Sequence, residues 1–537
     1  MAFPGERVDG NDFALKAIEL GAGAVVMTRD PEDEVVAMAR ERGCAVLTCD
    51  DPTEFLLRLA QGYRARLRCT VIGVTGSIGK TTTKDVLAAC LSKRYRVHAT
   101  AGNYNNLIGL PLTILSAPAD TQMLVLEMGM NDFGEISRLT ACAQPTFGII
   151  TKVGTSHIGM LGSREGIARA KAEIVEGMPP SAENFEGHHS ALVLHGEDDF
   201  TPYIIERYAR PAGIDVVLAG TSTDDDVYAT HIELDEDGRA HFDITFEDGS
   251  SFKTHLSIPG AQSVPNALFA AAVAHRLGVP AFEIDEAFAS LEMTGRRAQV
   301  RHAACGARVI DDSYNASPES MAAGLDLLGS LPCSGTRIAV LGEMGEMGDE
   351  APRLHALTGA YAAAKRPGLL ICVGGELADE MAAAARLMGM DEGDVQVVPS
   401  CDVLIKRFAG VLGERDLVLV KGSRFVGLDR FVEEVCADAR YPCVSHLPGF
   451  SGHLHIRDDR RAHHALVDPL SQKGRHRAAD SRRRPPVAPG QGRHAHHGRR
   501  DHPARRLLHL PDHGPSHRRA AARRGRDARH RRARPVR

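Results

Sequence analysis

One glycine-rich segment constrains the fold more than any other part of the chain. Residues 73–83 read Gly-Val-Thr-Gly-Ser-Ile-Gly-Lys-Thr-Thr-Thr, after the apolar run Cys69-Thr70-Val71-Ile72 and ahead of a helical pattern from Lys84 to Cys90. A strand, a glycine turn and a helix start direct backbone N–H groups toward one point, where the helix dipole adds partial positive charge. Such an arrangement binds phosphate, so the segment predicts a nucleotide site within an α/β unit.

The side chains of this segment have separate roles in the predicted site. The ammonium of Lys80 would reach the outer phosphates, and the hydroxyl of Thr81 would hold Mg²⁺. The common P-loop pattern has glycine where this chain has Val74, whereas the Gly-Lys-Thr core and its context agree with it. An ordinary glycine turn is the alternative. We expect the nucleotide to be bound by Gly76, Ser77, Gly79, Lys80, Thr81 and Thr82.

The length and composition are those of a multidomain globular protein. A chain of 537 residues, 43% of them hydrophobic, holds roughly three or four domains. No apolar run approaches the roughly 20 residues of a membrane span, and the first residues lack the apolar core of a secretory signal. The eleven cysteines form no Cys-x-x-Cys pair, so we expect reduced thiols in a cytoplasmic protein.

Charge is divided unevenly along the chain. The net charge is −5, but residues 451–537 carry +17, with 23 arginines, one lysine and seven aspartates, whereas residues 1–450 carry −22. The C-terminal segment has no Phe, Tyr or Trp, so it cannot bury enough apolar area to offset its ordering entropy and is expected to be disordered.

Three interpretations of this basic tail remain open. A nucleic-acid-binding arm is possible because arginine neutralises phosphate, although the stacking aromatics of single-strand binders are missing. The 13 histidines of the tail could bind metal, but they show no regular ligand spacing. Translation in a shifted frame is the interpretation we favour, because Arg, Ala, Gly, Pro and His are the residues that GC-rich codons give out of register.

Between Cys69 and Ser445, strand-like runs alternate with helical patterns, which predicts parallel sheets with crossover helices. A more β-rich stretch, 228–258, alternates apolar and polar residues, and residues 12–47 form a short α/β piece of their own. The expected strands lie at 24–27, 45–47, 69–72, 123–126, 146–150, 191–194, 308–310, 337–341, 369–373, 395–398 and 417–420.

Two side chains are expected at the edge of the sheet where the nucleotide binds. Glu127 ends the run 123–126, and His157 follows the run 146–150. Ligands bind beyond the carboxyl ends of parallel strands, where a carboxylate suits Mg²⁺. A surface carboxylate and a structural histidine are the simpler alternatives. Gly154 stands where a GTPase carries its guanine-reading aspartate, so guanine is disfavoured.

Further polar segments follow strands or form loops. The loop 103–111 combines amides, a glycine and a proline, and such clusters either cap turns or bind peptide and phosphate groups. Residues 311–318 and 421–424 each follow a strand of the second α/β series and should face a cleft. Lys171 lies in a helical pattern, and its spacing alone predicts a solvated side chain.

Together these motifs resemble those of the Mur ligases, and among them the branch that adds D-alanyl-D-alanine. The resemblance covers roughly residues 1–440 and rests on Thr-Gly-Ser-x-Gly-Lys-Thr-Thr, the loop 103–111, Glu127-Met128-Gly129-Met130-Asn131, the run 312–316 and Lys421-Gly422-Ser423-Arg424. The Asp-Asn-Pro-Arg motif of the diaminopimelate-adding branch is absent.

The resemblance implies a three-domain α/β architecture followed by the disordered tail. The implied parts are a partial UDP-substrate-binding domain at 1–69, a central ATP-binding P-loop domain at 70–303, a Rossmann-like C-terminal domain at 304–445 and the basic tail at 446–537.

The resemblance also implies the chemistry. ATP would phosphorylate the terminal carboxylate of a UDP-N-acetylmuramoyl tripeptide, and the amine of D-alanyl-D-alanine would attack the acyl phosphate and expel phosphate. Amide formation from a carboxylate is uphill at neutral pH, so ATP is required, and the protein acts by positioning and charge stabilisation. The implied protein is a cytoplasmic monomer without a membrane span, and nucleic acid is not expected among its partners. Another Mur-type ATP-dependent ligase, an inactive truncated product and a P-loop nucleic-acid-binding protein are the alternatives.

Residue roles are carried over in the same way. Thr81 and Glu127 would hold one Mg²⁺ and His157 a second, while Lys171 matches the lysine that the family carbamylates into a metal-associated anion. The implied catalytic residues are Lys80, His157, Lys171 and Arg296, the last of which approaches the phosphates. Adenine would contact Asn266 and Tyr314, ribose would contact Asp312, and the substrates would contact Asn105, Asn106, Asn315, Lys421, Ser423 and Arg424.

The sequence departs from the family pattern in three places. Family members carry further residues ahead of the point that matches Phe3–Gly10, including a contact to the uridine nucleotide, and we expect a start placed late to account for this. The motif Gly-x-His ahead of Asn266 reads Gly260-Ala261-Gln262 here, which keeps hydrogen-bonding capacity without the imidazole. After about Arg440 the pattern ends where a short closing helix is expected.

Overall fold

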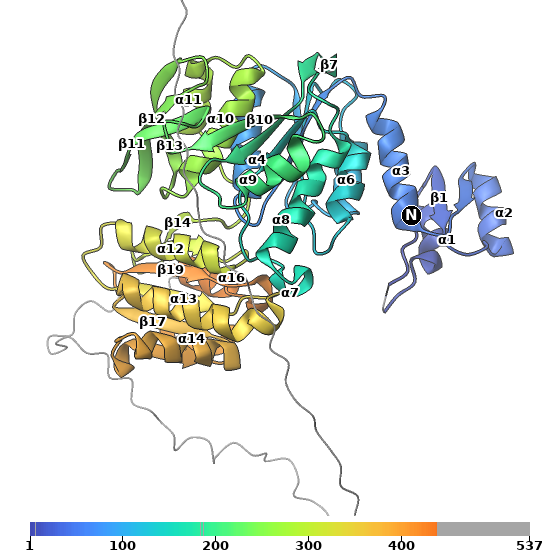
Figure 1. Ribbon diagram of the computed structural model, residues 1–537. Coiled ribbons are helices and arrows are strands. Elements are labelled where there is room, and N and C mark those ends of the chain that lie inside the picture. The colour runs from blue at the N-terminus through green and yellow to red at the C-terminus, as the bar shows by residue number, and fades with distance from the viewer. Residues whose placement is uncertain (6, 183, 186, 438–537) are drawn as a thin grey trace, which may run out of the picture. The chain divides into compact units, whose positions relative to one another are not determined.

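The computed structural model describes residues 1–5, 7–182, 184–185 and 187–437. The expected closing helix and the expected disorder of the basic tail lie outside these residues. Three α/β regions follow one another along the described chain, each built around a sheet of its own (Figure 1). The prediction of an α/β fold is confirmed.

The first region is a small parallel α/β unit. Strands β1 (Ala24–Met27) and β2 (Ala45–Thr48) pair in parallel. Their apolar core includes Ile18 of the first helix and Val35 of the second. The other elements here are η1 (Gly10–Phe13), α1 (Ala14–Glu19), α2 (Asp33–Arg42) and α3 (Pro52–Arg64).

The central region is a nine-stranded sheet in the order β13-β12-β11-β10-β9-β6-β3-β5-β4. The seven strands β11, β10, β9, β6, β3, β5 and β4 are mutually parallel. Strands β12 and β13 add an antiparallel edge beside β11. The strands are β3 (Thr70–Thr75), β4 (Val97–Ala99), β5 (Met123–Glu127), β6 (Phe147–Ile150), β9 (Ala191–His195), β10 (Asp215–Gly220), β11 (Val227–Leu234), β12 (Arg239–Thr245) and β13 (Ser251–Pro259).

Helices bury both faces of this sheet. Because side chains alternate across a strand, Val71 of β3 packs in one core cluster, whereas Ile72 and Val74 pack in another with α4 and α10. The helices are α4 (Lys80–Ser92), α5 (Gly109–Ser116), α6 (Glu135–Ala143), α7 (Ile158–Leu161), α8 (Arg164–Ala172), η2 (Glu173–Gly177), α9 (Thr201–Ile204), η3 (Ile205–Ala209), α10 (Ser263–Arg276) and α11 (Ala281–Ala289). A short pair, β7 (Asn184–Phe185) and β8 (His188–His189), lies apart from the main sheet.

The third region is a six-stranded sheet in the order β14-β15-β19-β16-β17-β18, parallel except for β14. Its strands are β14 (Gln299–His302), β15 (Arg308–Asp312), β16 (Arg337–Gly342), β17 (Leu369–Val373), β18 (Val395–Val398) and β19 (Leu417–Lys421). Its helices are α12 (Pro318–Ser330), η4 (Gly348–Glu350), α13 (Ala351–Lys365), α14 (Glu376–Leu387), η5 (Glu392–Asp394), α15 (Cys401–Phe408), η6 (Arg424–Val426) and α16 (Asp429–Ala437).

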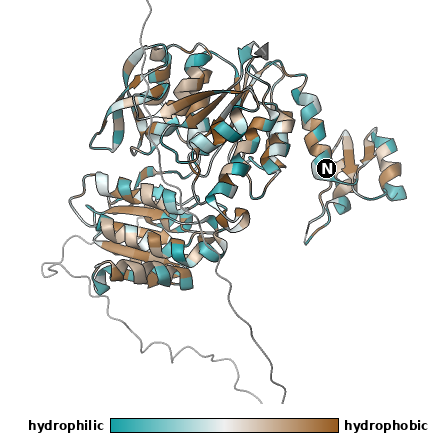
Figure 2. Cartoon of the chain, in the orientation of Figure 1, coloured by the Kyte–Doolittle hydropathy of each residue, from teal (hydrophilic) through white to brown (hydrophobic). Residues whose placement is uncertain are grey.

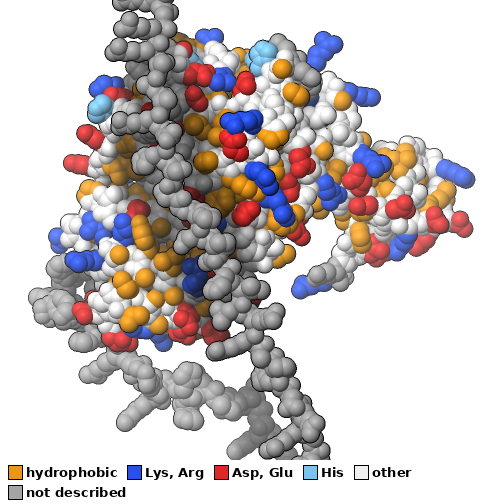
Figure 3. Space-filling view, viewed as in Figure 1, with side chains coloured by type: hydrophobic (Ala, Val, Ile, Leu, Met, Phe, Trp, Pro, Cys, Tyr) orange, Lys and Arg blue, Asp and Glu red, His pale blue; other side chains and the backbone are white. Residues whose placement is uncertain are grey.

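Hydropathy follows this layering. Figure 2 shows the strands of the central and third sheets as hydrophobic and the helices around them as mixed. On the face drawn in Figure 3, acidic and basic side chains of the described residues are interspersed. In the part of the chain that the structure describes, no helix is long and apolar enough to cross a membrane.

Strand register brings the polar segments together. In the central sheet, Val74 at the end of β3 lies opposite Glu127, and Thr75 lies opposite Ile150. In the third sheet, Asp312 at the end of β15 lies opposite Lys421. Each set therefore stands at the carboxyl edge of its own sheet, where ligands of parallel sheets bind.

Candidate active site

A cavity of about 540 Å³ is lined from both the central and the third region. It contains fourteen of the predicted site residues: Ser77, Gly79, Lys80, Thr81, Thr82, Asn105, Asn106, Glu127, His157, Asn266, Asp312, Tyr314, Asn315 and Lys421. Five others are not among its lining residues: Gly76, Lys171, Arg296, Ser423 and Arg424.

The phosphate loop has the backbone that its glycines predict. Gly79 has φ +84°, and a Cβ there would lie 2.3 Å from the side-chain oxygen of Asn266. Only glycine meets both conditions without strain. The Lys80 ammonium donates to the carbonyl of Gly76 at 2.7 Å, and desolvation lowers its pKa although the Glu127 carboxylate opposes this. The loop thus holds a cation directly over its own turn.

The carboxylate of Glu127 accepts a hydrogen bond at each of its two oxygens. The Thr81 hydroxyl donates to its Oε2 at 2.7 Å, and the Asn105 amide donates to its Oε1 at 2.8 Å. Its side chain is buried. A hydroxyl and a buried carboxylate in contact, next to a phosphate loop, form the oxygen-rich set that Mg²⁺ prefers.

His157 connects the two regions that line the cavity. It has a left-handed backbone, φ +64°, ahead of α7. Its Nδ1 lies 2.7 Å from Oε2 of Glu346, which follows β16 in the third region. The imidazole lowers the pKa of the Glu346 carboxyl, and the positive charge of Lys80 contributes in the same direction. Glu346 also lines the cavity and was not predicted as a site residue, although its place beyond a strand end could have indicated it.

Lys171 differs from what its spacing alone predicts. It lies on α8 with only 2% of its surface exposed, and within the described residues its ammonium has neither a hydrogen bond nor an ion pair. Burial, reinforced by the charge of Lys80, holds its pKa well below the ordinary value. The expectation of a solvated lysine is wrong, because the helix face that carries Lys171 turns into the core.

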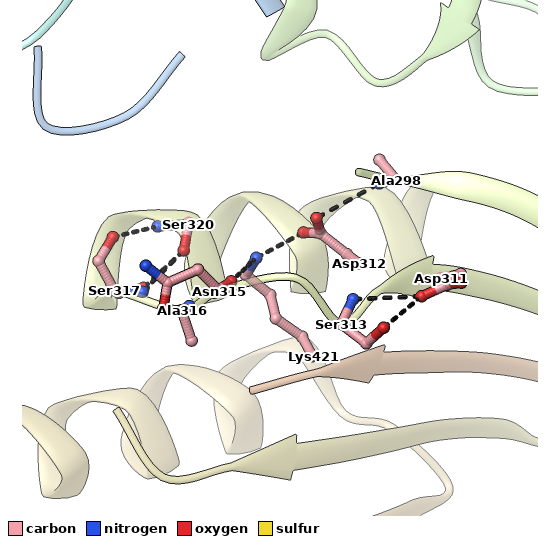
Figure 4. A network of polar contacts seen from close by, with 9 residues as sticks. All are labelled: Ala298, Asp311, Asp312, Ser313, Asn315, Ala316, Ser317, Ser320 and Lys421. Carbon is pink, nitrogen blue, oxygen red and sulfur yellow. Dashed lines mark hydrogen bonds and ion pairs between the residues drawn. The ribbon is translucent and has the colours of Figure 1, made fainter. Parts of the chain in front are cut away.

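The third region contributes a compact polar network to the cavity (Figure 4). The Lys421 ammonium pairs with Asp312 Oδ2 at 2.6 Å and donates to the carbonyl of Asn315 at 3.0 Å. The backbone N–H of Ala298 donates to the other oxygen of Asp312 at 3.3 Å. Behind it, Ser313 donates to the buried Asp311 at 2.6 Å. The network fixes the loop after β15 against the end of β19.

The two arginines of the segment before β14 point to different places. Arg296 pairs with Asp429 at 2.6 Å and with Glu433, both on α16. Arg297 lines the cavity, and its guanidinium lies 4.6 Å from the centre of the Tyr314 ring. Its charge also lowers the pKa of Lys80. The structure therefore brings Arg297, and not the predicted Arg296, to the cavity that the phosphate loop lines.

The remaining predicted residues border the site. The Thr83 hydroxyl donates to the side-chain oxygen of Asn266 at 3.2 Å, and the Asn266 amide donates to the carbonyl of Gln262, also at 3.2 Å. Gln262 also lines the cavity. The Ser423 hydroxyl accepts from the backbone N–H of Gly345, and Arg424 lies 6.0 Å from the Tyr314 ring.

Comparison with known proteins gives this site a family. The model of the Mur ligase middle domain matches residues 74–274, and that of the Mur ligase, glutamate ligase domain matches residues 296–424. A UDP-N-acetylmuramoyl-tripeptide–D-alanyl-D-alanine ligase of Bacillus subtilis (strain 168) is 35% identical over 435 residues, covering 80% of this chain and 88% of the relative. The chain belongs to the Mur ligase family.

Solved Mur ligase structures agree with the fold. A crystal structure of MurF from Acinetobacter baumannii has a TM-score of 0.70 and 28% identity, over 81% of this chain and 90% of that one. MurF ligase from Thermotoga maritima, solved in complex with ADP, has a TM-score of 0.68 and 26% identity, over 81% and 93% of the two chains. The Mur ligase architecture predicted from the motifs is thus confirmed.

Proposed function

We propose that this chain joins D-alanyl-D-alanine to the terminal carboxylate of a UDP-N-acetylmuramoyl tripeptide, with conversion of ATP to ADP and phosphate. The relatives named above carry that activity in their names. One observation supports the proposal most directly: a single cavity contains the phosphate loop, the Thr81–Glu127 pair and the Asp312–Lys421 network. This is an arrangement suited to moving a phosphoryl group between two bound partners.

The phosphate end of the cavity supplies positive charge. Lys80 and Arg297 would neutralise the phosphoryl oxygens as they develop charge. Such electrostatic stabilisation is a main part of how proteins catalyse phosphoryl transfer. Asn266 and Tyr314 would contact adenine, and Asp312 would bind the ribose. Arg296, paired on α16, would reach the phosphates only after leaving Asp429 and Glu433.

The donor set fits Mg²⁺. Thr81 and Glu127 would hold one ion and His157 a second, and these ions would supply electrostatic stabilisation of the transferred phosphoryl group. The buried Lys171, with its lowered pKa, is suited to carry a neutral amine. Its nitrogen would attack CO₂ and lose a proton, and the resulting carbamate would place an anion near Lys80.

The acceptor side would be formed by the loops that follow the strand ends. Asn105, Asn106, Asn315, Lys421, Ser423 and Arg424 would contact the two substrates. We propose domains at 1–69, 70–303 and 304–445, the first of them a UDP-substrate-binding domain, in a cytoplasmic monomer.

The test is phosphate release from ATP and Mg²⁺ by the full chain. Release should require both the UDP-N-acetylmuramoyl tripeptide and D-alanyl-D-alanine, and mass spectrometry should find the pentapeptide product. Release that needs the tripeptide but accepts a different amine would overturn the acceptor assignment. Release with neither substrate would overturn the ligase.

A further inference from the structure

Two charged residues of α4 lie deep in the protein outside the roles described so far. Lys84 is 2% exposed and Asp85 is 8% exposed. They sit one turn beyond Lys80 and Thr81 on the same helix, so that Thr81, Lys84 and Asp85 share one side of it. Buried charges are expensive and persist when they are paired and hydrogen-bonded. Both conditions hold here, because the Lys84 ammonium lies 2.5 Å from Oδ1 of Asp85.

From Lys84 the contacts lead to Glu127. The Lys84 ammonium donates to the carbonyl of Thr100 at 2.9 Å. The hydroxyl of Thr100 in turn accepts the backbone N–H of Glu127 at 3.0 Å. Thr100 itself is buried. Lys84 is therefore one residue removed from the backbone that positions the carboxylate facing Thr81.

From Asp85 the contacts lead to the segment that carries Arg297. Oδ2 of Asp85 accepts the backbone N–H of Thr294 at 3.0 Å and its hydroxyl at 2.6 Å. Thr294 lies between α11 and β14, three residues ahead of Arg297, in a stretch without helix or strand. Since no ladder of backbone hydrogen bonds holds this stretch, its position depends on side-chain contacts of this kind.

We propose that Lys84 and Asp85 are positioning residues for the nucleotide site, which hold the Arg297 segment in register with Glu127 through Thr294 and Thr100. The same helix begins with Lys80 and Thr81, so one rigid element sets the places of the phosphate loop, the carboxylate and the arginine. The contact between Asp85 and Thr294 anchors this segment to α4, while Arg296 and Ala298, on either side of Arg297, hold it to α16 and to Asp312. This inference deepens the proposed function, on which it rests.

Thr294→Val tests the link with little change in volume. It removes one hydrogen bond to a buried carboxylate, and we expect the dissociation constant of a fluorescent ADP analogue and the KM for ATP to rise about tenfold. The turnover number at saturating ATP should change much less. Thr294→Ser restores the hydroxyl and should return both constants to within about twofold of the wild type.

A control of the same chemistry lies elsewhere in the same region. The Thr254 hydroxyl donates to Asp285 at 2.8 Å between β13 and α11, and neither residue lines the cavity. Thr254→Val should lower thermal stability by a similar amount and leave ADP affinity unchanged. Equal loss of stability in Thr294→Val and Thr254→Val, with unchanged ADP affinity in both, would show that the Asp85 link is merely structural.

Asp85→Asn is a second variant that keeps the shape and one acceptor. We expect it to weaken ADP binding severalfold while the circular dichroism spectrum stays that of the wild type. Because ADP binding is measured without the peptide substrates, the result stands apart from the ligase assay. Wild-type ADP affinity in both Asp85→Asn and Thr294→Val would overturn the inference, and inactivity of the wild-type ligase would overturn only the proposed function.

Discussion

Replacing Lys421 by methionine should loosen the end of the third sheet. The Lys421 side chain is 3% exposed, and its ammonium makes two contacts, to Asp312 at 2.6 Å and to the carbonyl of Asn315 at 3.0 Å. Each hydrogen bond to a charged group contributes about 1.5–3 kcal/mol, and loss of one partner of a buried pair costs about 3–5 kcal/mol. Asp312 would keep only the long contact from Ala298. We therefore expect Lys421→Met to lower the free energy of unfolding of this part of the sheet by about 4 kcal/mol.

Amide hydrogen exchange measures this loss where it occurs. Peptides that contain β15 and β19 should exchange roughly 1,000-fold faster in Lys421→Met. The exposed Lys406 of α15 provides a control in the same region. Lys406→Met should change the free energy of opening, as measured by exchange, by less than about 0.5 kcal/mol. The double variant Lys421→Met/Asp312→Asn should lose less stability than the two single variants together, because the second change removes the carboxylate that the first leaves unpaired. A loss below about 1 kcal/mol in Lys421→Met, or strict additivity, would refute the reasoning.

Two other predictions follow from the cavity and its core. Arg297→Ala should raise the KM for ATP by about tenfold or more, whereas its neighbour Arg296→Ala should not, and equal effects would contradict the assignment of Arg297 to the phosphate end of the cavity. Lys171→Met should abolish phosphate release and, in bicarbonate-free buffer, raise the free energy of unfolding. Because burial lowers the folded-state pKa of Lys171, its destabilising effect is full below that pKa, declines as pH rises toward the ordinary value of 10.5 and then vanishes. The stability that Lys171→Met gains over the wild type should therefore shrink as the pH rises through this range. Urea unfolding that shows the same gain at every pH would contradict a lowered pKa for Lys171.

The strands and the phosphate loop could be predicted because their signals are local. Apolar runs such as 123–126 and 369–373 correspond to β5 (Met123–Glu127) and β17 (Leu369–Val373), and glycine at 79 is demanded by a positive φ and by the nearby Asn266. Glu127 could be placed for a related reason, since parallel strands end at one edge and a carboxylate at a strand end must lie there.

Side chains whose roles depend on distant partners could not be placed. Arg296 and Arg297 are adjacent in sequence and chemically alike. Their tertiary partners distinguish them, because Arg296 pairs with acidic residues of α16 whereas Arg297 packs on the ring of Tyr314. Glu346 lies far along the chain from His157, yet the two meet at 2.7 Å. The links from Asp85 to Thr294 and from Lys84 to Thr100 span 209 and 16 residues and have no local signature.

The sequence by itself determined the α/β elements, the phosphate loop and the membership of a ligase family, because these rest on periodicity, glycine geometry and short motifs. Only the tertiary structure decided which cations face the cavity, that Lys171 is buried without a partner among the described residues, and that α4 is tied to the segment of Arg297. The physical reason is that burial and pairing are properties of the surroundings. A lysine or arginine has the same chemistry at every position, and the packing around it sets its pKa and its partners.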